Sequence, residues 1–112
     1  LYERGKGIGR SDELAHKWYG EAAAAGDPDA MFRLGQEFER GRGVRKDQAT
    51  AVQWYLKSAT AGFLPAQMLV AEAYEKGRYD LAKDKAKALE WYTKAAAQGS
   101  KDAANKVRDL AK

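Results

Sequence analysis

The sequence predicts an all-α protein in which antiparallel helix pairs stack side by side into a solenoid. A Trp-Tyr pair occurs three times, beginning at Trp18, Trp54 and Trp91, so that successive pairs are 36 and 37 residues apart. Glycines and alanines recur in register with these pairs. A period of this length is typical of repeat proteins, in which each unit buries its apolar face against its neighbours.

Five further positions follow the same period. These positions hold Tyr2, Phe38 and Tyr74; Gly5, Gly41 and Gly77; Ala15, Ala51 and Ala88; Gly26, Gly62 and Gly99; and Ala30, Ala66 and Ala103. The third unit carries one extra residue between Gly77 and Asp84, where we expect a loop that tolerates an insertion. We therefore treat residues 1–112 as one repeat domain. It divides into a partial first unit (1–26), a second unit (27–62), a third unit (63–99) and a C-terminal capping helix (100–112).

The second unit contains the start and stop signals of two helices. Asp27-Pro28 marks the first start, because aspartate caps a helix N-terminus well and proline is favoured at the first helical position. Gly41 marks its end, since the residue after a helix often needs a positive φ. Asp47 then caps a second helix that extends toward Gly62. The third unit repeats these signals.

The two ends of the chain depart from this pattern. Tyr2 and Gly5 correspond only to the end of a first helix, and the glycine-rich segment 5–9 is interpreted as the turn that follows it. Ser100 is expected to cap a last, amphipathic helix from Lys101 to about Ala111.

Composition excludes several kinds of chemistry. The chain has no cysteine, so it has no disulfide, thiol nucleophile or cysteine zinc site. Its one histidine, His16, cannot form a multi-histidine metal site or a catalytic triad alone, and we expect a surface or partly packed side chain. No apolar run approaches the roughly 20 residues of a membrane helix. We expect no metal and no cofactor.

The charge pattern argues against nucleic-acid binding. The net charge of +4 arises within residues 83–112, where lysines alternate with acidic residues as on a solvated helix face. A nucleic-acid surface would need denser basic residues and exposed aromatics. The chain opens without methionine or an apolar signal region, which suggests a processed protein or an excised piece. Its compartment, cytoplasm or bacterial periplasm and envelope, stays open.

The other motifs also favour structural roles. A phosphate-binding loop needs a strand before it, whereas segments 5–9 and 41–43 are expected between helices. The carboxylate pairs lie at helix starts or on exposed faces, where capping and solvation explain them. The three tryptophans share one position in the repeat, so inter-helix packing is favoured over a sugar or base platform. The sequence therefore predicts a protein without enzymatic activity.

The repeat unit resembles that of a known family. The run from Ala30 to Gly62, with Leu34-Gly35, Asp47 and Trp54-Tyr55, is similar to the Sel1-like repeat, a relative of the tetratricopeptide repeat. The third unit fits as well, although Val70-Ala71 replaces Leu-Gly and Tyr79 replaces the second loop glycine. The resemblance implies a right-handed α-solenoid that acts as an adaptor for protein complexes, common in bacterial signalling and envelope assembly.

The same resemblance implies a binding surface, because the first helix of each pair would line the concave face. The expected partner-binding residues are Phe32, Gln36, Glu39 and Arg40 in the second unit, Met68, Glu72, Glu75 and Lys76 in the third, and Asn105, Asp109 and Lys112 in the cap. Phe32 and Met68 are apolar where the repeat does not require it, which favours a groove floor for a partner peptide or helix. The alternative is that both residues pack in the core. The variant Phe32→Ala distinguishes the two possibilities: if Phe32 lines the groove, the variant binds a partner more weakly but keeps its helical content, whereas loss of the fold would place Phe32 in the core.

Two other possibilities follow from the sequence. The chain could be a small-ligand-binding or sensor module of a larger bacterial envelope or signalling protein. The helix over residues 11–25 has no visible cover for Leu14, Trp18 and Ala22. Either further units precede it, or this edge associates with another chain, including a second copy.

Overall fold

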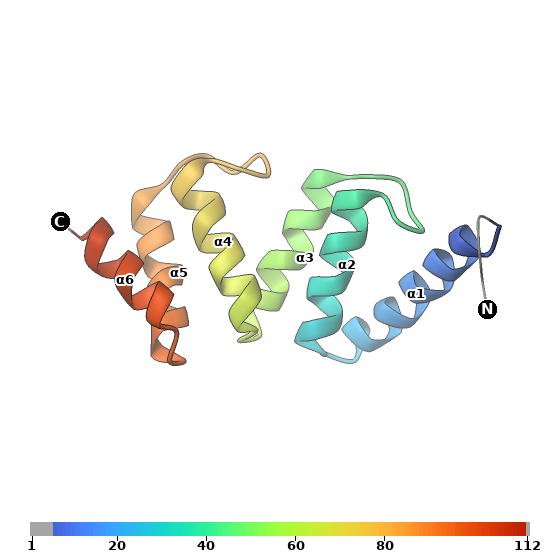
Figure 1. Cartoon of the computed structure of the whole chain (residues 1–112), viewed down its shortest axis with the longest axis horizontal. Coiled ribbons are helices and arrows are strands. Elements are labelled where there is room, and N and C mark those ends of the chain that lie inside the picture. The colour runs from blue at the N-terminus through green and yellow to red at the C-terminus, as the bar shows by residue number, and fades with distance from the viewer. Residues whose placement is uncertain (1–5, 112) are drawn as a thin grey trace.

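The computed structural model describes the backbone of residues 6–111 and the side chains of residues 13–111. Within these residues it contains six helices and no strand (Figure 1). The helices are α1 (Lys6–Ala24), α2 (Pro28–Arg40), α3 (Gln48–Thr60), α4 (Leu64–Lys76), α5 (Lys85–Ala97) and α6 (Lys101–Leu110). The prediction of an all-α fold is confirmed.

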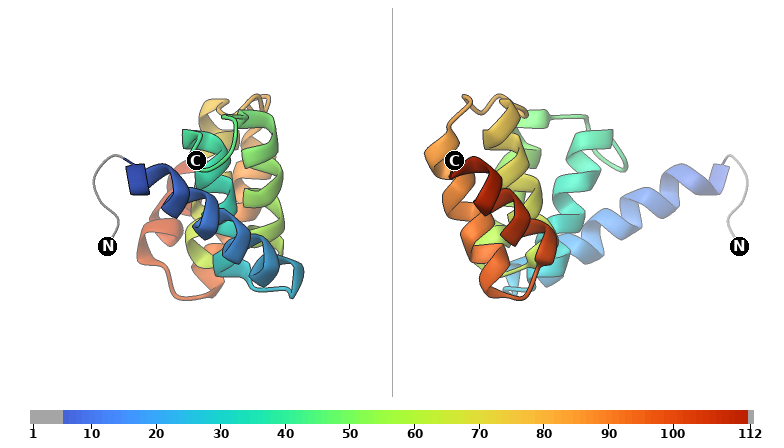
Figure 2. Two further views of the ribbon diagram at one scale, coloured as in Figure 1. Left: turned by 90° about the vertical axis from the view of Figure 1, so that its right-hand side faces the viewer. Right: turned by 60° about the vertical axis from the view of Figure 1, so that its left-hand side comes forward.

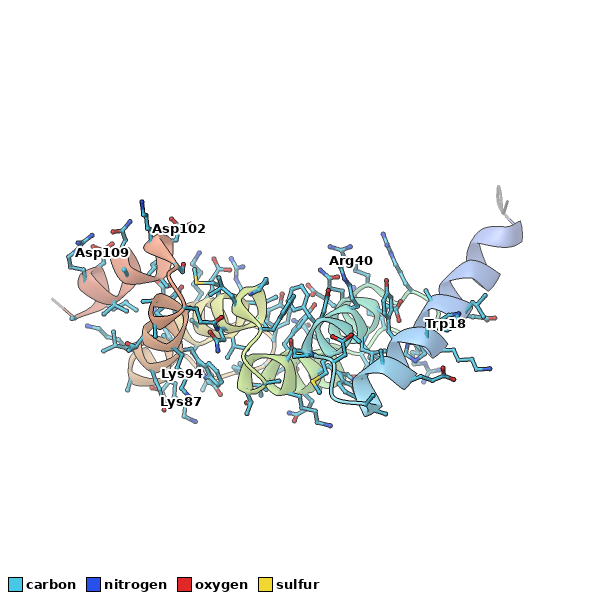
Figure 3. The ribbon with its side chains drawn as sticks, turned by 90° about the horizontal axis from the view of Figure 1, so that it is seen from below. Trp18, Arg40, Lys87, Lys94, Asp102 and Asp109 are labelled. Atoms are coloured by element: carbon cyan, nitrogen blue, oxygen red, sulfur yellow. The ribbon has the colours of Figure 1, made fainter. Side chains whose placement is uncertain are left out.

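The helices form an elongated solenoid of 52 × 24 × 23 Å. Every helix packs mainly on its neighbours in the sequence, and the chain runs steadily from α1 at one end to α6 at the other (Figure 1). Seen at right angles to that view, α2, α4 and α6 lie along one long side, and α3 and α5 lie along the other (Figure 3). The ends of the molecule rise toward the side of α2, α4 and α6, which is therefore the concave side.

Capping explains where the helices begin and end. The Asp27 carboxylate accepts hydrogen bonds from the backbone N–H groups of Asp29 and Ala30, at 3.0 and 3.4 Å. Asp47, Asp84 and Ser100 cap α3, α5 and α6 in the same manner. Gly41 ends α2 with a φ of 74°, a left-handed conformation that glycine adopts without steric cost. These caps confirm the predicted starts of α2, α3, α5 and α6 and the predicted end of α2, whereas Phe63 at the start of α4 makes no side-chain capping hydrogen bond.

The core consists of small residues between helices and of rings that fill the remaining space. Tyr55 and Tyr92 occupy equivalent positions and are 0% and 1% exposed. The backbones of α2 and α3 approach so closely that a Cβ built on Gly35 would lie 2.6 Å from the Tyr55 ring and 3.1 Å from the Ala51 carbonyl oxygen. Glycine is required there by space.

The tryptophans behave differently at the end of the stack. Trp54 and Trp91 are half-buried and pack on core clusters, which confirms the packing interpretation for these two. Trp18 is 64% exposed, so the interpretation is wrong for the first unit. The reason is geometric, because α1 leans away from the stack and no described residue covers this side of it (Figure 2).

The turn expected over residues 5–9 is also wrong within the described residues, since α1 already begins at Lys6. In the later units the loop is anchored to the preceding helix. The N–H of Asp47 donates to the Phe38 carbonyl oxygen, and the N–H of Asp84 donates to that of Tyr74, both at 2.8 Å. The matching position in the first unit, Tyr2, lies outside the described residues with Gly5.

The loop between α4 and α5 accommodates the extra residue of the third unit. Tyr79 and Asp80 take left-handed φ values of 56° and 64°, where the second unit has Gly43 at 74°. Such a conformation is uncommon for residues with a side chain. It carries Tyr79 back toward the concave side of the second unit.

Candidate functional site

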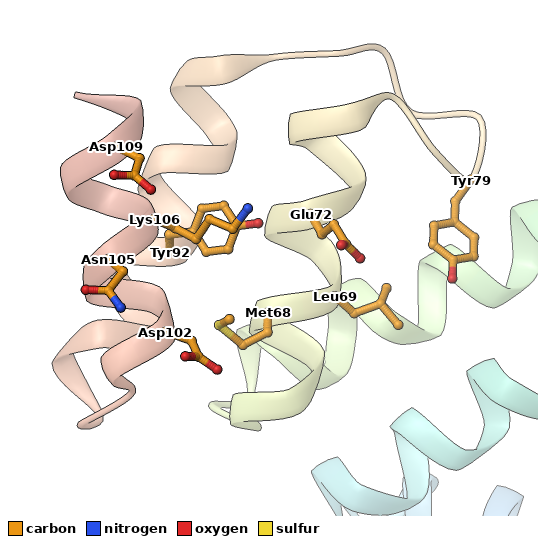
Figure 4. Close-up of a pocket in the computed structure, with 9 residues that line it drawn as sticks. All are labelled: Met68, Leu69, Glu72, Tyr79, Tyr92, Asp102, Asn105, Lys106 and Asp109. Atoms are coloured by element: carbon orange, nitrogen blue, oxygen red, sulfur yellow. The ribbon is translucent and has the colours of Figure 1, made fainter. Parts of the chain in front are cut away.

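A pocket of about 470 Å³ opens on the concave side between α4 and α6, with α5 behind it (Figure 4). It is lined by Met68, Leu69, Glu72, Tyr79, Tyr92, Asp102, Asn105, Lys106 and Asp109. Four of the residues expected to bind a partner, Met68, Glu72, Asn105 and Asp109, thus lie around one cavity. They come from two helices that the repeat places side by side along the groove.

The floor of this pocket is apolar and adaptable. Met68 and Leu69 are half-buried on the first turns of α4. The Met68 sulfur accepts a hydrogen bond from the Ser100 hydroxyl at 3.9 Å, which ties the floor to the cap of α6. Methionine has an unbranched, polarizable side chain that adjusts to different apolar surfaces. The floor therefore suits an apolar side chain of a partner.

The rim of the pocket is mostly acidic. Glu72 forms ion pairs with Lys76 at 3.2 Å and with Arg78 at 3.6 Å. Asp102 and Asp109 are exposed on α6 and form no ion pair with any residue that the structure describes. Figure 4 shows both carboxylates on the α6 side of the pocket. They remain available to a cation from outside.

Two equivalent glutamates on the first helices serve as internal acceptors. The Tyr55 hydroxyl donates to Glu39 Oε1 at 2.6 Å, and the Tyr79 hydroxyl donates to Glu39 Oε2 at 3.1 Å. In the next unit the Tyr92 hydroxyl donates to Glu75 at 2.7 Å. Glu39 and Glu75 were expected to bind a partner, and each accepts hydrogen bonds from tyrosines of its own chain.

The electrostatics of these contacts keep the donors protonated. Burial, followed by the hydrogen bond to a carboxylate, raises the pKa of Tyr55 and of Tyr92 well above the usual value. The Tyr92 hydrogen bond lowers the pKa of Glu75, and the Lys106 ammonium at 3.5 Å acts in the same direction. Glu75 is thus ionised and engaged at neutral pH.

Phe32 belongs more to the core than to the groove. Its ring lies 5.3 Å from the Tyr55 ring and 5.4 Å from the Phe63 ring, measured between centroids. It is half-buried and packs on the core cluster of α3 and α4. The structure therefore favours the packing alternative for Phe32, whereas its counterpart Met68 lines the pocket.

The remaining predicted residues lie elsewhere. Gln36 and Arg40 line a smaller hollow of about 210 Å³ between α1 and α2. Lys76 is exposed and pairs with Glu72. Lys112 lies outside the described residues. Six of the expected binding residues thus lie at two separate hollows, four at the pocket between α4 and α6 and two at the hollow between α1 and α2.

The pocket also contains five residues that were not predicted from the sequence: Leu69, Tyr79, Tyr92, Asp102 and Lys106. Asp102 could be predicted from the sequence, because it precedes the predicted Asn105 by three residues and thus shares its helix face. Tyr79 carried a weaker signal, a bulky residue in place of a loop glycine. Its direction depends on the left-handed backbone, which the sequence does not reveal.

His16 is partly packed, as expected. Its Nδ1 lies 2.9 Å from Glu37 Oε1, and its ring meets the Phe38 ring edge-on at 5.4 Å. Over the described part of the chain, no group of three or more His, Cys, Asp or Glu side chains is arranged to hold a metal ion. None of the described helices is both long and apolar enough to cross a membrane.

Comparison with known proteins agrees with this architecture. The Sel1 repeat family matches residues 1–27, 28–63 and 64–100. A Sel1 repeat protein from Oxalobacter formigenes is similar in structure, with a TM-score of 0.77 and 35% identity over 85% of this chain and 39% of that one. No curated protein matches the chain.

Two further structures share the fold. One is c5321, a protective antigen of uropathogenic Escherichia coli strains that displays an SLR fold, with a TM-score of 0.74 and 36% identity over 85% of this chain and 20% of that one. The other is the cysteine rich protein B of Helicobacter pylori, with a TM-score of 0.73 and 20% identity over 88% of this chain and 87% of that one. The present chain spans well under half the length of the first two proteins.

Proposed function

Because the chain belongs to the Sel1 repeat family, whose members are generally non-catalytic protein–protein interaction scaffolds, we propose that it binds a peptide or helix of a partner protein in its concave groove. The partner segment would lie along α4 and α6. The chain itself would act as an adaptor without enzymatic activity.

The observation that carries this proposal is the pocket between α4 and α6. An apolar floor of Met68 and Leu69 lies beside two carboxylates, Asp102 and Asp109, that have no described partner. These carboxylates are seven positions apart on α6, which is about 10 Å along a helix. The chemistry fits a segment with an apolar side chain for the floor and lysine or arginine for the rim.

The charge distribution supports binding of a basic segment at the groove. The net charge of +4 arises within residues 83–112, so a basic partner would be repelled by the lysine-rich outer side of α5. Lys87 and Lys94 lie on the convex side, opposite Asp102 and Asp109 (Figure 3). A basic segment is therefore directed to the groove.

A small-ligand site is less well supported. The pocket volume falls within the range of about 300–1,000 Å³ that is common for small-molecule sites. Such sites bury most of the ligand, whereas this pocket is open along the groove and bordered by exposed carboxylates. These features favour a longer, charged partner.

Selection from a random peptide library on the immobilised chain tests the proposal. We expect enrichment of peptides with lysine or arginine near an aliphatic or aromatic residue. The affinity of a selected peptide is then measured by calorimetry for the wild type, for the double variant Asp102→Asn, Asp109→Asn and for Met68→Ala. The matched control is Glu90→Gln, which removes an exposed carboxylate from α5.

We expect the double variant to lose about tenfold in affinity, roughly 1.4 kcal/mol, and the control to lose none. The difference between wild type and double variant is expected to shrink at high salt, because exposed charges are screened. Equal affinities for the wild type and both groove variants would remove the groove from the proposal.

A further inference from the structure

The first helix leaves two large apolar side chains in water. Leu14 is 48% exposed and Trp18 is 64% exposed, and they lie one turn apart on α1. They are the exposed large apolar side chains of the described structure. Trp18 has two counterparts in the chain, and their surroundings indicate what kind of surface it fits.

The counterparts of Trp18 join each unit to the one before it. Trp54 packs on a cluster of Ala23, Ala30 and Leu34 from α1 and α2. Trp91 packs on a cluster that contains the residues 36 positions further on, Ala59, Ala66 and Val70. The same side chain thus meets the same type of surface twice: two alanines and one branched aliphatic residue.

The opposite end of the molecule carries a third copy of that surface. The residues 37 positions after Ala59, Ala66 and Val70 are Ala96, Ala103 and Val107 on α5 and α6. Ala59 and Val70 are 1% and 0% exposed. Ala96 and Val107 are half-buried, so this copy of the surface is partly open.

The two ends also differ in what surrounds the tryptophan. The ammonium groups of Lys57 and Lys94 lie 4.6 and 4.7 Å from the ring centroids of Trp54 and Trp91. The residue at the same distance after Trp18 is Glu21. Its ring therefore lacks the lysine that accompanies the other two.

We propose that the face of α1 formed by Leu14 and Trp18 docks on the face formed by Ala96 and Val107 of a second copy of this chain. The contact would repeat the internal packing of Trp54 and Trp91 between molecules, so it continues an interface already present in the fold. The two faces differ, which makes the association head-to-tail and open-ended rather than a closed two-fold dimer. This inference does not depend on the groove.

Analytical ultracentrifugation of the chain over a wide concentration range tests the first part. We expect the weight-average mass of the wild type to rise with concentration beyond that of a dimer. Trp18→Glu removes the ring from one face, and Ala96→Glu places a charge on the other. We expect both variants to be monomeric over the range in which the wild type associates.

Matched controls carry the same charge at exposed neighbouring positions. Ala24→Glu on α1 and Ala97→Glu on α5 are expected to associate like the wild type. Circular dichroism checks that every variant is folded. If Ala96→Glu disturbs α5, Val107→Glu on α6 replaces it, with the same expectation.

Mixing the two monomeric variants is the decisive measurement. Trp18→Glu retains its alanine face and Ala96→Glu retains its tryptophan face, so an equimolar mixture is expected to form a 1:1 dimer and nothing larger. Association of Ala96→Glu on its own would indicate a symmetric tryptophan contact and overturn the proposal. A wild type that stays monomeric at every concentration would overturn it as well.

Discussion

The second and third units share one helical frame, yet their concave sides differ. In the second unit Phe32 packs between Tyr55 and Phe63, and Tyr79 reaches back from the next loop to Glu39. In the third unit the counterpart of Phe32 is Met68, and the space beside it is a pocket. The repeat thus determines the course of the groove, whereas the side chain at a single position, Phe32 or Met68, determines whether the groove is filled or leaves a pocket.

Replacing the two floor residues is the strongest test of this difference. We expect Phe32→Ala to lower the free energy of unfolding by about 2–3 kcal/mol, because it removes a half-buried ring that contacts two others. Met68→Ala should cost about 1 kcal/mol or less, since part of its side chain already faces the pocket. Urea unfolding followed by circular dichroism measures both. Equal losses would mean that the two floors are equivalent.

The helix contacts of the two units are distinguished by Gly35 and its counterpart Ala71. Gly35→Ala should destabilise the protein by about 1–2 kcal/mol, because the close approach to Tyr55 outweighs the helix propensity of alanine. Ala71 is fully buried, so Ala71→Gly should also destabilise, by about 1 kcal/mol. A gain in melting temperature for Gly35→Ala would show that the two interfaces have the same spacing.

The hydrogen bonds to Glu39 and Glu75 should differ in how much stability is lost when one tyrosine hydroxyl is removed. Tyr92→Phe removes the tyrosine donor of Glu75, and we expect a loss of about 1 kcal/mol in unfolding free energy. Tyr79→Phe leaves Glu39 bonded to Tyr55, so its loss should be about half as large. Thermal unfolding of the two variants at neutral pH provides the comparison, and a larger loss for Tyr79→Phe would contradict it.

The smallest expected effect is on the acid side of the pH–stability curve. The hydrogen bond from Tyr92 and the charge of Lys106 lower the pKa of Glu75 below its ordinary value of 4.5. The stabilisation is therefore complete above that value and disappears as the pH falls through the lowered pKa. We expect Glu75→Gln to flatten the decline of stability below about pH 4.5. If the stability of Glu75→Gln declined with the same slope as that of the wild type, the acid sensitivity would arise from other carboxylates.

Much of the fold was predictable because the relevant signals are local. Asp27, Asp47, Asp84 and Gly41 act on backbone groups within four residues of themselves, so their roles follow from the sequence alone. The 36- and 37-residue period then places equivalent helices side by side. The turn expected over residues 5–9 is wrong within the described residues, where α1 already begins at Lys6.

The candidate site was predictable only in part. Met68, Glu72, Asn105 and Asp109 follow from the helix face that the repeat turns toward the groove. Glu39 satisfies the same pattern, yet it accepts hydrogen bonds from Tyr55 and Tyr79, 16 and 40 residues away. A pattern of exposed faces does not indicate which polar atoms meet across helices.

The sequence by itself determined the period, the helix boundaries after α1 and the family of this chain, because caps, glycines and the spacing of rings act over short distances. Only the tertiary structure decided which glutamates are bound internally, which floor residue leaves a pocket and which tryptophan stays exposed. These outcomes depend on contacts between side chains of different helices. Such contacts exist only once the stack has formed.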